Sequence, residues 1–363
     1  MTRLPPLARR SKTLSASLGL GEKLFASSEE RRFAEAIETG LVEVEEGLLR
    51  EVAFADDMAD VTSRYLLEAG GKRIRPVLTL LTAQLGDGNN PAVITAAQAV
   101  EITHLASLYH DDVMDEAEMR RGVPSAQNVW GNSVAILTGD LLFARASKLV
   151  ASLGEGAIKL QADTFERLCL GQLHETIGPR GDDDPIEHYL QVLADKTGSL
   201  IAAAAQMGVI FSNAPEEFAA PVVAFGEKIG VAFQLIDDVI DLAEPEAETG
   251  KAQGTDLRSG VATLPLLFLR RAALTDPEAA ALLARIVRTV EADVIAGVPA
   301  SETPDDELAA AIAELRAHDV TAETLDEARR WADEAVAALD PLPEGPVKLA
   351  LTKFAEAVVE RST

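Results

Sequence analysis

The chain consists mainly of long stretches in which apolar residues recur every three or four positions. Leu41, Val44, Leu48 and Val52 show this pattern, which places them on one face of a helix that begins near Ser28. The same pattern predicts further helices over about 76–85, 91–115, 132–153, 155–177, 185–211, 215–243, 260–274, 276–296, 303–316, 321–339 and 344–361. No alternating apolar–polar run is long enough to indicate a strand.

The two ends of the chain differ in character from its middle. Residues 1–28 are rich in Ser, Pro and basic side chains, which predicts a loose arm. We expect one helical domain over 29–363, with the chemically informative motifs in 70–265. Residues 297–363 are rich in Glu, Asp and Ala and predict extra helices packed outside that part.

The composition favours helices around a core of small aliphatic side chains. Apolar residues make up 47% of the 363 residues, which is enough for a sizeable core, and aromatic residues make up only 4%. Alanine and leucine are prominent among the apolar residues, and both are strong helix formers. We therefore predict an all-α fold, a single large helical bundle.

Charge and cysteine content exclude several classes of protein. The formal net charge of -26 opposes binding to nucleic acid and to anionic lipid. The single cysteine, Cys169, lies in an apolar-flanked stretch and is expected to be a buried thiol in a reducing compartment. No secretory signal and no apolar run of about 18 residues is present, so we expect a cytoplasmic protein without stable membrane insertion.

Two acidic clusters share one spacing, two adjacent aspartates and a third three positions later, each on an apolar helix. Their members are Asp111, Asp112, Asp115, Asp237, Asp238 and Asp241. One such cluster in an acidic protein is usually a solvated helix end. Two with identical spacing indicate more, because clustered carboxylates repel unless a cation neutralises them and oxygen ligands suit magnesium. We expect the clusters to face each other across the bundle, hold magnesium and grip a diphosphate.

The paired clusters resemble the two aspartate-rich motifs of trans-isoprenyl diphosphate synthases, and the resemblance covers about residues 30–270. It implies the isoprenoid synthase helical fold with a central active-site cavity. It also implies a homodimeric prenyltransferase that uses roughly two or three magnesium ions per site. The reaction would join isopentenyl diphosphate head to tail to an allylic diphosphate and give an all-trans polyprenyl diphosphate.

Basic residues around the first cluster match further motifs of that family. The run from Gly70 to Pro76 places three cations beside a flexible turn, where glycine lets the backbone approach a phosphate. The resemblance assigns isopentenyl diphosphate to Lys72 and Arg75, with Arg73 a weaker candidate. It also makes His104 a diphosphate-binding residue.

Arg120 and Arg121 follow the first cluster directly. Adjacent side chains cannot point the same way, so each can serve a different substrate. By resemblance, Arg120 faces the allylic diphosphate and Arg121 faces isopentenyl diphosphate. The alternative is a pair of weak surface salt bridges to Glu116 and Glu118.

Four residues later in the chain match contacts to the allylic diphosphate or its leaving group: Lys196, Thr197, Gln234 and Lys251. Many relatives carry one more lysine just before a Thr-Leu-Pro run, and this chain does not. Closure of that loop would therefore depend more on Lys251 and Arg258.

The implied mechanism is ionisation of the allylic diphosphate followed by attack of the isopentenyl double bond. Magnesium and nearby cations stabilise the charge that develops on the leaving diphosphate. The departing diphosphate takes up the proton, because no dedicated protein base is evident. The catalytic residues are then Asp111, Asp115, Asp237, Lys196 and Arg120.

The helix before Asp111 is expected to set product length. Ala106, Ser107 and, further up, Thr103 are small or medium in size, and in this family bulky residues there stop elongation early. We predict a product of roughly six to ten isoprene units, about C30 to C50. A geranylgeranyl or farnesyl product is the alternative, because a tunnel floor supplied by another helix cannot be read from sequence.

Three other functions compete with this interpretation. A class I terpene cyclase shares the first acidic motif but usually mixes other residues into the second, and it needs no isopentenyl site. A non-catalytic partner subunit typically loses one acidic cluster or the arginine pair, and this chain keeps both. A purely structural helical protein leaves the paired clusters unexplained.

Overall fold

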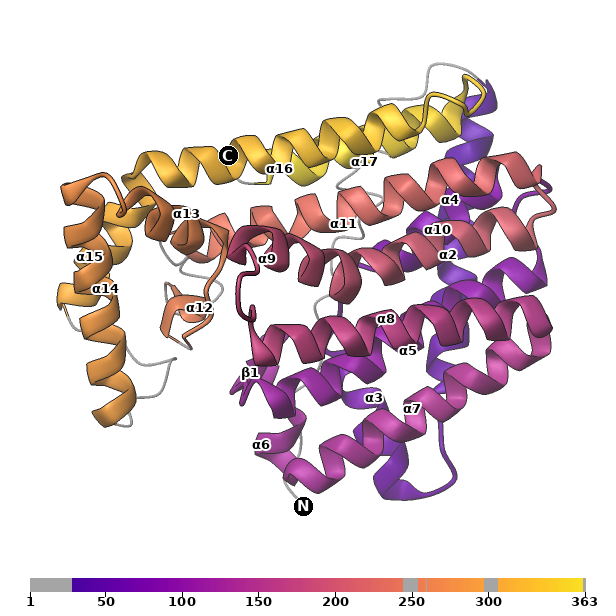
Figure 1. Ribbon diagram of the computed structural model, residues 1–363. Helices are drawn as coiled ribbons and strands as arrows, with labels where there is room; N and C mark the ends of the chain where they lie inside the picture. The colour runs from indigo at the N-terminus through magenta and orange to yellow at the C-terminus, as the bar shows by residue number, and fades with distance from the viewer. Residues whose placement is uncertain (1–27, 244–253, 259, 297–305, 362–363) are drawn as a thin grey trace. The chain divides into compact units, whose positions relative to one another are not determined.

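In the computed structural model, most of the described residues, which are 28–243, 254–258, 260–296 and 306–361, lie in helices (Figure 1). Lys251 and the predicted N-terminal arm, apart from its last residue, lie outside them. The helices are α2 (Ser28–Glu51), α3 (Asp57–Glu68), α4 (Ile74–Ala83), α5 (Pro91–Met114), α6 (Ala126–Trp130), α7 (Asn132–Leu153), α8 (Glu155–Ile177), α9 (Pro185–Leu193), α10 (Ser199–Phe211), α11 (Ala219–Asp241), α12 (Thr255–Arg258), α13 (Leu264–Ala272), α14 (Pro277–Ala296), α15 (Asp306–Ala317), α16 (Asp319–Ala338) and α17 (Pro346–Glu360).

Three short elements complete the list. The π-helical segment η1 (Ala194–Gly198) joins α9 to α10, and the 3-10 turn η2 (Glu216–Phe218) precedes α11. Strands β1 (Met119–Arg120) and β2 (Val123–Pro124) pair antiparallel, with Met119 opposite Pro124.

The chain divides into two compact units. Of the described residues, the first unit contains 28–166, 199–226 and 338–354, and the second contains 167–198, those of 227–337 and 355–361. The first acidic cluster therefore belongs to the first unit and the second acidic cluster to the second unit.

The first unit is built around α5, which packs against α7, α4, α10 and α2. Asn90 begins this helix, because its side chain accepts hydrogen bonds from the amides of Ala92 and Val93, and Pro91 occupies the first turn. Apolar side chains are buried on nearly every face of α5, as expected for a central helix. Its C-terminal end carries the first acidic cluster.

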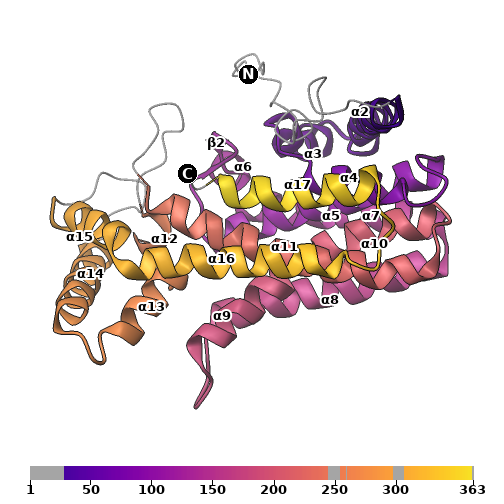
Figure 2. The ribbon, with the colours of Figure 1, turned by 90° about the horizontal axis from the view of Figure 1, so that it is seen from above.

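In the second unit, α13 packs against both α9 and α14. Figure 2 shows α14 lying beside α15, and the two helices are in contact. The terminal part of α11, which carries the second acidic cluster, also belongs to this unit.

The structure confirms the all-α fold and most of the predicted helices. The predicted helical region that begins at Ser28 is broken between α2 and α3, where Asp56 caps the new helix by accepting from the amides of Met58 and Ala59. The predicted helix over 185–211 is interrupted by η1. The prediction of a buried Cys169 was wrong, since its side chain is exposed on α8.

Within the described part of the chain, one helical run, Glu216–Asp241, is long and apolar enough by length and composition to cross a membrane. Half of its apolar window is buried inside the structure, as in a core helix of a folded domain. The acidic cluster at its end is also costly to place in a bilayer.

Candidate active site

The first acidic cluster contains one buried carboxylate and two that are at least partly accessible. Asp112 is completely buried and accepts a hydrogen bond of 2.6 Å from Nε of Arg120. Burial raises the pKa of Asp112, and the Arg120 cation opposes that rise. Asp111 and Asp115 lie four residues apart near the end of α5, half-buried and exposed respectively. These two carboxylates share a helix face that a cation can reach.

The second acidic cluster has the same spacing but different partners. Asp238 is buried and accepts hydrogen bonds from the Tyr189 hydroxyl at 2.8 Å and the Leu264 amide at 3.4 Å. Burial raises the pKa of Asp238 well above its ordinary value. Asp238 thus ties the start of α13 to α11, and sequence analysis did not identify Tyr189.

The other two aspartates of this cluster also contact other parts of the chain. Asp237 forms an ion pair of 3.0 Å with Arg361, at the end of the chain. Asp241 accepts a hydrogen bond of 3.1 Å from the Asp256 amide, and its carbonyl accepts one from the Gly254 amide. Asp241 therefore fixes the beginning of α12.

The chemistry of both clusters fits magnesium. Among the described residues, no group of three His, Cys, Asp or Glu side chains is placed to hold a metal ion by itself. Magnesium usually takes only one or two protein carboxylates and completes its shell with water and substrate phosphates. A second oxygen of Asp112, Oδ2, is buried without a hydrogen-bond partner in the described part of the chain, which leaves it available to a ligand.

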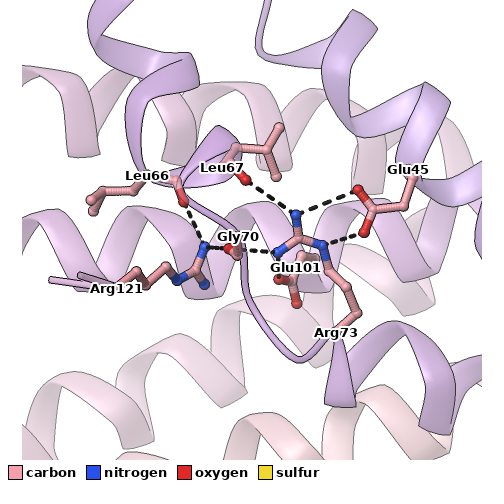
Figure 3. Close-up of polar contacts among 7 residues, drawn as sticks. All are labelled: Glu45, Leu66, Leu67, Gly70, Arg73, Glu101 and Arg121. Carbon is pink, nitrogen blue, oxygen red and sulfur yellow. Dashed lines mark hydrogen bonds and ion pairs between the residues drawn. The ribbon is translucent and has the colours of Figure 1, made fainter. Parts of the chain in front are cut away.

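The glycine-rich basic turn that begins at Gly70 is held in place by the side chain of Arg73 (Figure 3). Arg73 adopts a left-handed conformation with φ of 52° before α4, and its guanidinium donates to Glu45, Glu101 and the carbonyls of Gly70 and Leu67. Its side chain is only 6% exposed. Arg73 therefore stabilises the turn and does not present its charge to solvent.

Arg121 holds the same turn from another side. Its Nη1 donates to the carbonyls of Leu66 and Gly70. Gly71 has φ of 141°, and a Cβ there would lie 2.5 Å from the Arg73 guanidinium and 3.0 Å from that of Arg121. Glycine is required at this position because both arginines approach the backbone.

The remaining basic residues of the turn are placed differently. Lys72 is exposed, whereas Arg75 is half-buried and its Nε has no hydrogen-bond partner among the described residues. Burial lowers the pKa of Arg75 to about 10, and Glu101 opposes that change. A buried guanidinium nitrogen with an open hydrogen-bonding position favours an anionic ligand.

His104 lies one turn after Glu101 on α5 and faces this cationic region. Burial and the charges of Arg75, Arg121 and Arg120 hold the pKa of His104 well below its ordinary value. The imidazole is therefore neutral at physiological pH. The structure thus brings His104, Arg75, Arg120 and Arg121 into one positively charged region of the first unit.

Arg120 and Arg121 point apart, as predicted for adjacent residues. Arg120 forms an ion pair with the buried Asp112. Its ion pair also links β1 to the end of α5.

Lys196 and Thr197 lie in η1, a π-helical interruption of the kind that often marks functional sites. Lys196 forms an ion pair with Glu175 of α8. Gly171 of α8 allows this close approach, because a Cβ there would lie 2.7 Å from the Lys196 amide nitrogen.

The other predicted contacts of the second unit are only partly described. Gln234 is half-buried on α11, three residues before Asp237. Arg258 is buried in α12. Lys251 lies outside the described residues.

A small apolar cavity of about 10 Å³ lies between α5, α8 and α10. Thr103, one of the three predicted length-determining residues, lines it. Ala106 and Ser107 are buried nearer Asp111 and are not part of its lining. Gln161 of α8 and Met207 of α10 contribute opposite walls, which sequence analysis could not identify.

Comparisons with known proteins agree with this arrangement. A family model described as polyprenyl synthetase matches residues 57–296. The chain is 41% identical over 354 residues to the nonaprenyl diphosphate synthase of Mycobacterium tuberculosis, covering 97% of this chain and 99% of the relative. It is 36% identical over 304 residues to heptaprenyl diphosphate synthase component 2 of Geobacillus stearothermophilus, covering 84% and 90%.

Solved structures show the same fold. One is a geranylgeranyl pyrophosphate synthase from Corynebacterium glutamicum complexed with calcium and isoprenyl diphosphate, with a TM-score of 0.76, 40% identity and coverage of 93% of this chain and 99% of that chain. Another is a decaprenyl diphosphate synthase from Rhodobacter capsulatus, with a TM-score of 0.76, 31% identity and coverage of 92% and 99%. The fold, the motifs and these similarities together establish that the chain belongs to the polyprenyl synthetase family and is a prenyltransferase.

Proposed function

We propose that this prenyltransferase is a magnesium-dependent polyprenyl diphosphate synthase that condenses isopentenyl diphosphate with an allylic diphosphate. The observation that carries the proposal is the charged region of the first unit, where accessible aspartates at the end of α5 adjoin an arginine-rich anion site. A terpene cyclase does not need such a second anion site. The calcium and isoprenyl diphosphate in the Corynebacterium glutamicum structure are consistent with this chemistry.

Isopentenyl diphosphate is assigned to Lys72, Arg75, His104 and Arg121. The open Nε position of Arg75 and the neutral His104 can both hydrogen-bond to phosphate oxygens. Arg73 is not included, because its guanidinium is committed to carboxylates and carbonyls within the protein.

The allylic diphosphate is assigned to Arg120, Lys196, Thr197, Gln234 and Lys251. Their charges and hydrogen bonds stabilise the negative charge that grows on the leaving group as its C–O bond breaks. The allylic cation is then attacked by the double bond of isopentenyl diphosphate, and the released diphosphate accepts the proton.

Magnesium is assigned to the aspartates of both clusters, where it would polarise the diphosphate as a Lewis acid. Asp111, Asp115 and Asp237 are the proposed direct ligands, because their side chains are at least partly accessible. Asp112, Asp238 and Asp241 complete the clusters, and their hydrogen bonds to Arg120, Tyr189 and Asp256 orient the surrounding segments.

We propose a product of roughly six to ten isoprene units, since a tail that starts at Asp111 passes the small side chains of Ser107, Ala106 and Thr103. The long-chain products in the names of the relatives support this length. The geranylgeranyl alternative has support from the Corynebacterium glutamicum structure.

A homodimer is proposed from the surface of the first unit. Leu137 and Leu141 lie one turn apart on α7 and are 61% and 38% exposed, and Val129 of α6 and Ile158 of α8 are also exposed. Large apolar side chains in such numbers indicate an interface. A two-component enzyme is the second candidate, because one relative is named a synthase component.

We further propose a cytoplasmic location.

The assay is elongation of farnesyl diphosphate by isopentenyl diphosphate, with products identified by mass. We expect turnover with magnesium, none after chelation, and a loss of at least about a hundredfold in Asp111→Ala and Asp237→Ala, the scale of a lost transition-state contact. Asp163→Ala, which removes an exposed aspartate of α8, is the matched control and should retain activity. A nearly active Asp111→Ala with intact helical content would refute the assignment.

A further inference from the structure

One face of the C-terminal half of α8 contacts the π-helical segment η1. Arg167, Gly171 and Glu175 follow one another at intervals of four residues, so they form a stripe along the helix. Arg167 binds the side chain of Asp195, and Glu175 forms an ion pair with Lys196. Gly171 lies between them, where a Cβ would stand 2.7 Å from the Lys196 amide nitrogen. Each member of the stripe therefore contacts η1.

The carboxylate of Asp195 is held from two helices. Nε of Arg167 donates to its Oδ1 at 3.0 Å, and Nη2 of Arg167 lies 2.9 Å from the same oxygen. The other oxygen, Oδ2, accepts from the side-chain amide of Gln191, on α9, at 2.9 Å. With both oxygens bonded and only 15% of its side chain exposed, Asp195 is fixed in one orientation. Lys196 follows Asp195 directly, so the backbone from which the lysine side chain extends is fixed as well.

Arg167 also connects η1 to α11. Its Nη1 donates to Glu227, so one guanidinium lies between the carboxylates of Asp195 and Glu227. The backbones approach closely at the same place, because a Cβ at Gly198 would lie 2.9 Å from the Glu227 carbonyl oxygen. Without the guanidinium, two like charges would repel each other where η1 packs against α11.

The π-helical geometry of η1 depends on contacts of this kind. A π-helical turn is rare and occurs mostly as a single turn within an α-helix, frequently at functional sites. Lys196 and Thr197 both lie in this turn. Because a π-helical hydrogen bond spans five residues and an α-helical one spans four, a return to α-helical geometry would rotate both side chains about the helix axis.

We propose that Arg167 is a positioning residue, which holds η1 in its π-helical form so that Lys196 and Thr197 reach the allylic diphosphate. This inference rests on the proposed function, which assigns those two residues to that substrate. The three guanidinium nitrogens of Arg167 all contact Asp195 or Glu227, so Arg167 acts through η1 and not by binding substrate.

Loss of Arg167 should affect the two substrates unequally. A misplacement of about 1 Å in a substrate-binding group can cost about a hundredfold in rate. That misplacement would occur in the second unit, to which η1 belongs, whereas the residues assigned to isopentenyl diphosphate all belong to the first unit.

The first test measures kcat and both KM values of Arg167→Met, which keeps an apolar stem and removes the guanidinium. The ratio kcat/KM for farnesyl diphosphate should fall by about 10- to 100-fold, while KM for isopentenyl diphosphate stays within about twofold. Arg167→Lys keeps a cation near both carboxylates and should recover part of the loss. The matched control is Arg285→Met, because Arg285 is 35% exposed, against 40% for Arg167, and pairs with Glu314 in the same unit. This control should leave both KM values within about twofold.

A double-mutant cycle tests whether Arg167 acts through Lys196. If it does, Arg167→Met should lower kcat by less than about threefold in a Lys196→Ala background, because the group that it positions is already absent. A merely structural role would give similar losses in both backgrounds. Asp195→Asn, which weakens the same contact and retains Arg167, takes the place of Arg167→Met if that variant fails to fold.

The outcomes separate this inference from the proposed function. A selective loss for the allylic substrate, together with a smaller effect in the Lys196→Ala background, supports the positioning role. Unchanged kinetics, equal changes in both KM values, or equal losses in both backgrounds would overturn it and leave the synthase assignment intact. Absence of elongation by the unmodified protein would instead overturn the proposed function.

Discussion

Removal of the Arg73 guanidinium should destabilise the first unit, because it leaves the carboxylate of Glu101 in the core without its closest partner. The two side chains are 6% and 3% exposed, and their nearest atoms are 3.2 Å apart. Breaking such a buried pair costs about 3–5 kcal/mol. Arg75 and Arg121 also lie close enough to favour ionised Glu101, so the cost of breaking the pair should be near the lower end of that range, about 3 kcal/mol.

The backbone hydrogen bonds of Arg73 add to that cost. The guanidinium donates to the carbonyls of Gly70 and Leu67, and each net contribution is about 0.5–1.5 kcal/mol. The ion pair of Arg73 with Glu45, whose side chain is 37% exposed, adds little to the free energy of unfolding. The expected loss for Arg73→Met is therefore about 4 to 6 kcal/mol in the free energy of unfolding.

Thermal unfolding followed by far-UV circular dichroism measures this loss. For a unit of roughly 200 residues, the expected decrease in Tm is on the order of 10 °C or more. The double variant Arg73→Met/Glu101→Gln should recover much of it, because no buried carboxylate remains. Arg64→Met removes a more exposed pair on α3 with Asp60, and it should cost less than about 1 kcal/mol.

A kinetic readout separates positioning of the turn from general destabilisation. Below its melting range, Arg73→Met should raise KM for isopentenyl diphosphate more than KM for the allylic substrate, because the turn carries Lys72 and Arg75. A variant that melts within about 2 °C of the unmodified protein would refute the account of the buried ion pair. Equal changes in both KM values would refute the positioning role.

Three further predictions concern single contacts. Tyr189→Phe removes the hydroxyl that donates to Asp238, and it should raise the magnesium concentration needed for half-maximal turnover. An unchanged metal titration would contradict a role of Tyr189 in positioning Asp238. Arg361→Ala removes the guanidinium paired with Asp237. Because Arg361 and magnesium compete for that carboxylate, the apparent magnesium affinity should increase, and a decrease would contradict the competition. The depressed pKa of His104 means that the unfolded chain binds a proton more readily, so stability should fall as pH drops below about 6.5. His104→Gln should flatten that part of a Tm–pH profile, and an unchanged profile would contradict the assignment.

The sequence was sufficient to predict the fold and to place both acidic clusters on helices. Long runs of three- and four-residue periodicity located the helices, because buried faces repeat at that interval. Asp111 and Asp237 were identifiable because two identical spacings in apolar helices are hard to explain by surface charge alone. The family resemblance added the basic motifs and their order.

The individual tasks of these residues depend on partners distant in the chain. Arg73 and Lys72 are neighbours in the same motif, yet only Arg73 is enclosed, by carboxylates that each lie 28 residues away. Asp238 is fixed by Tyr189, 49 residues earlier, a contact that no local pattern indicates. Such roles follow from tertiary packing and could not be predicted from spacing.

Two other features show the limit of local patterns. Cys169 has apolar neighbours in sequence, but a helix turns each successive side chain by about 100°, and Leu168 takes the buried position while Cys169 faces outward. The walls that Gln161 and Met207 contribute to the cavity come from helices α8 and α10, so the helix before Asp111 alone could not reveal them.

The most direct measurement of the central claim is the mass of the products that the purified, unmodified protein forms from farnesyl diphosphate, isopentenyl diphosphate and magnesium. We expect a ladder of all-trans polyprenyl diphosphates that ends at about six or more isoprene units. A ladder that ends at about four units would contradict the long-chain assignment. A folded protein that binds magnesium and diphosphate but never lengthens the starter would contradict the synthase itself.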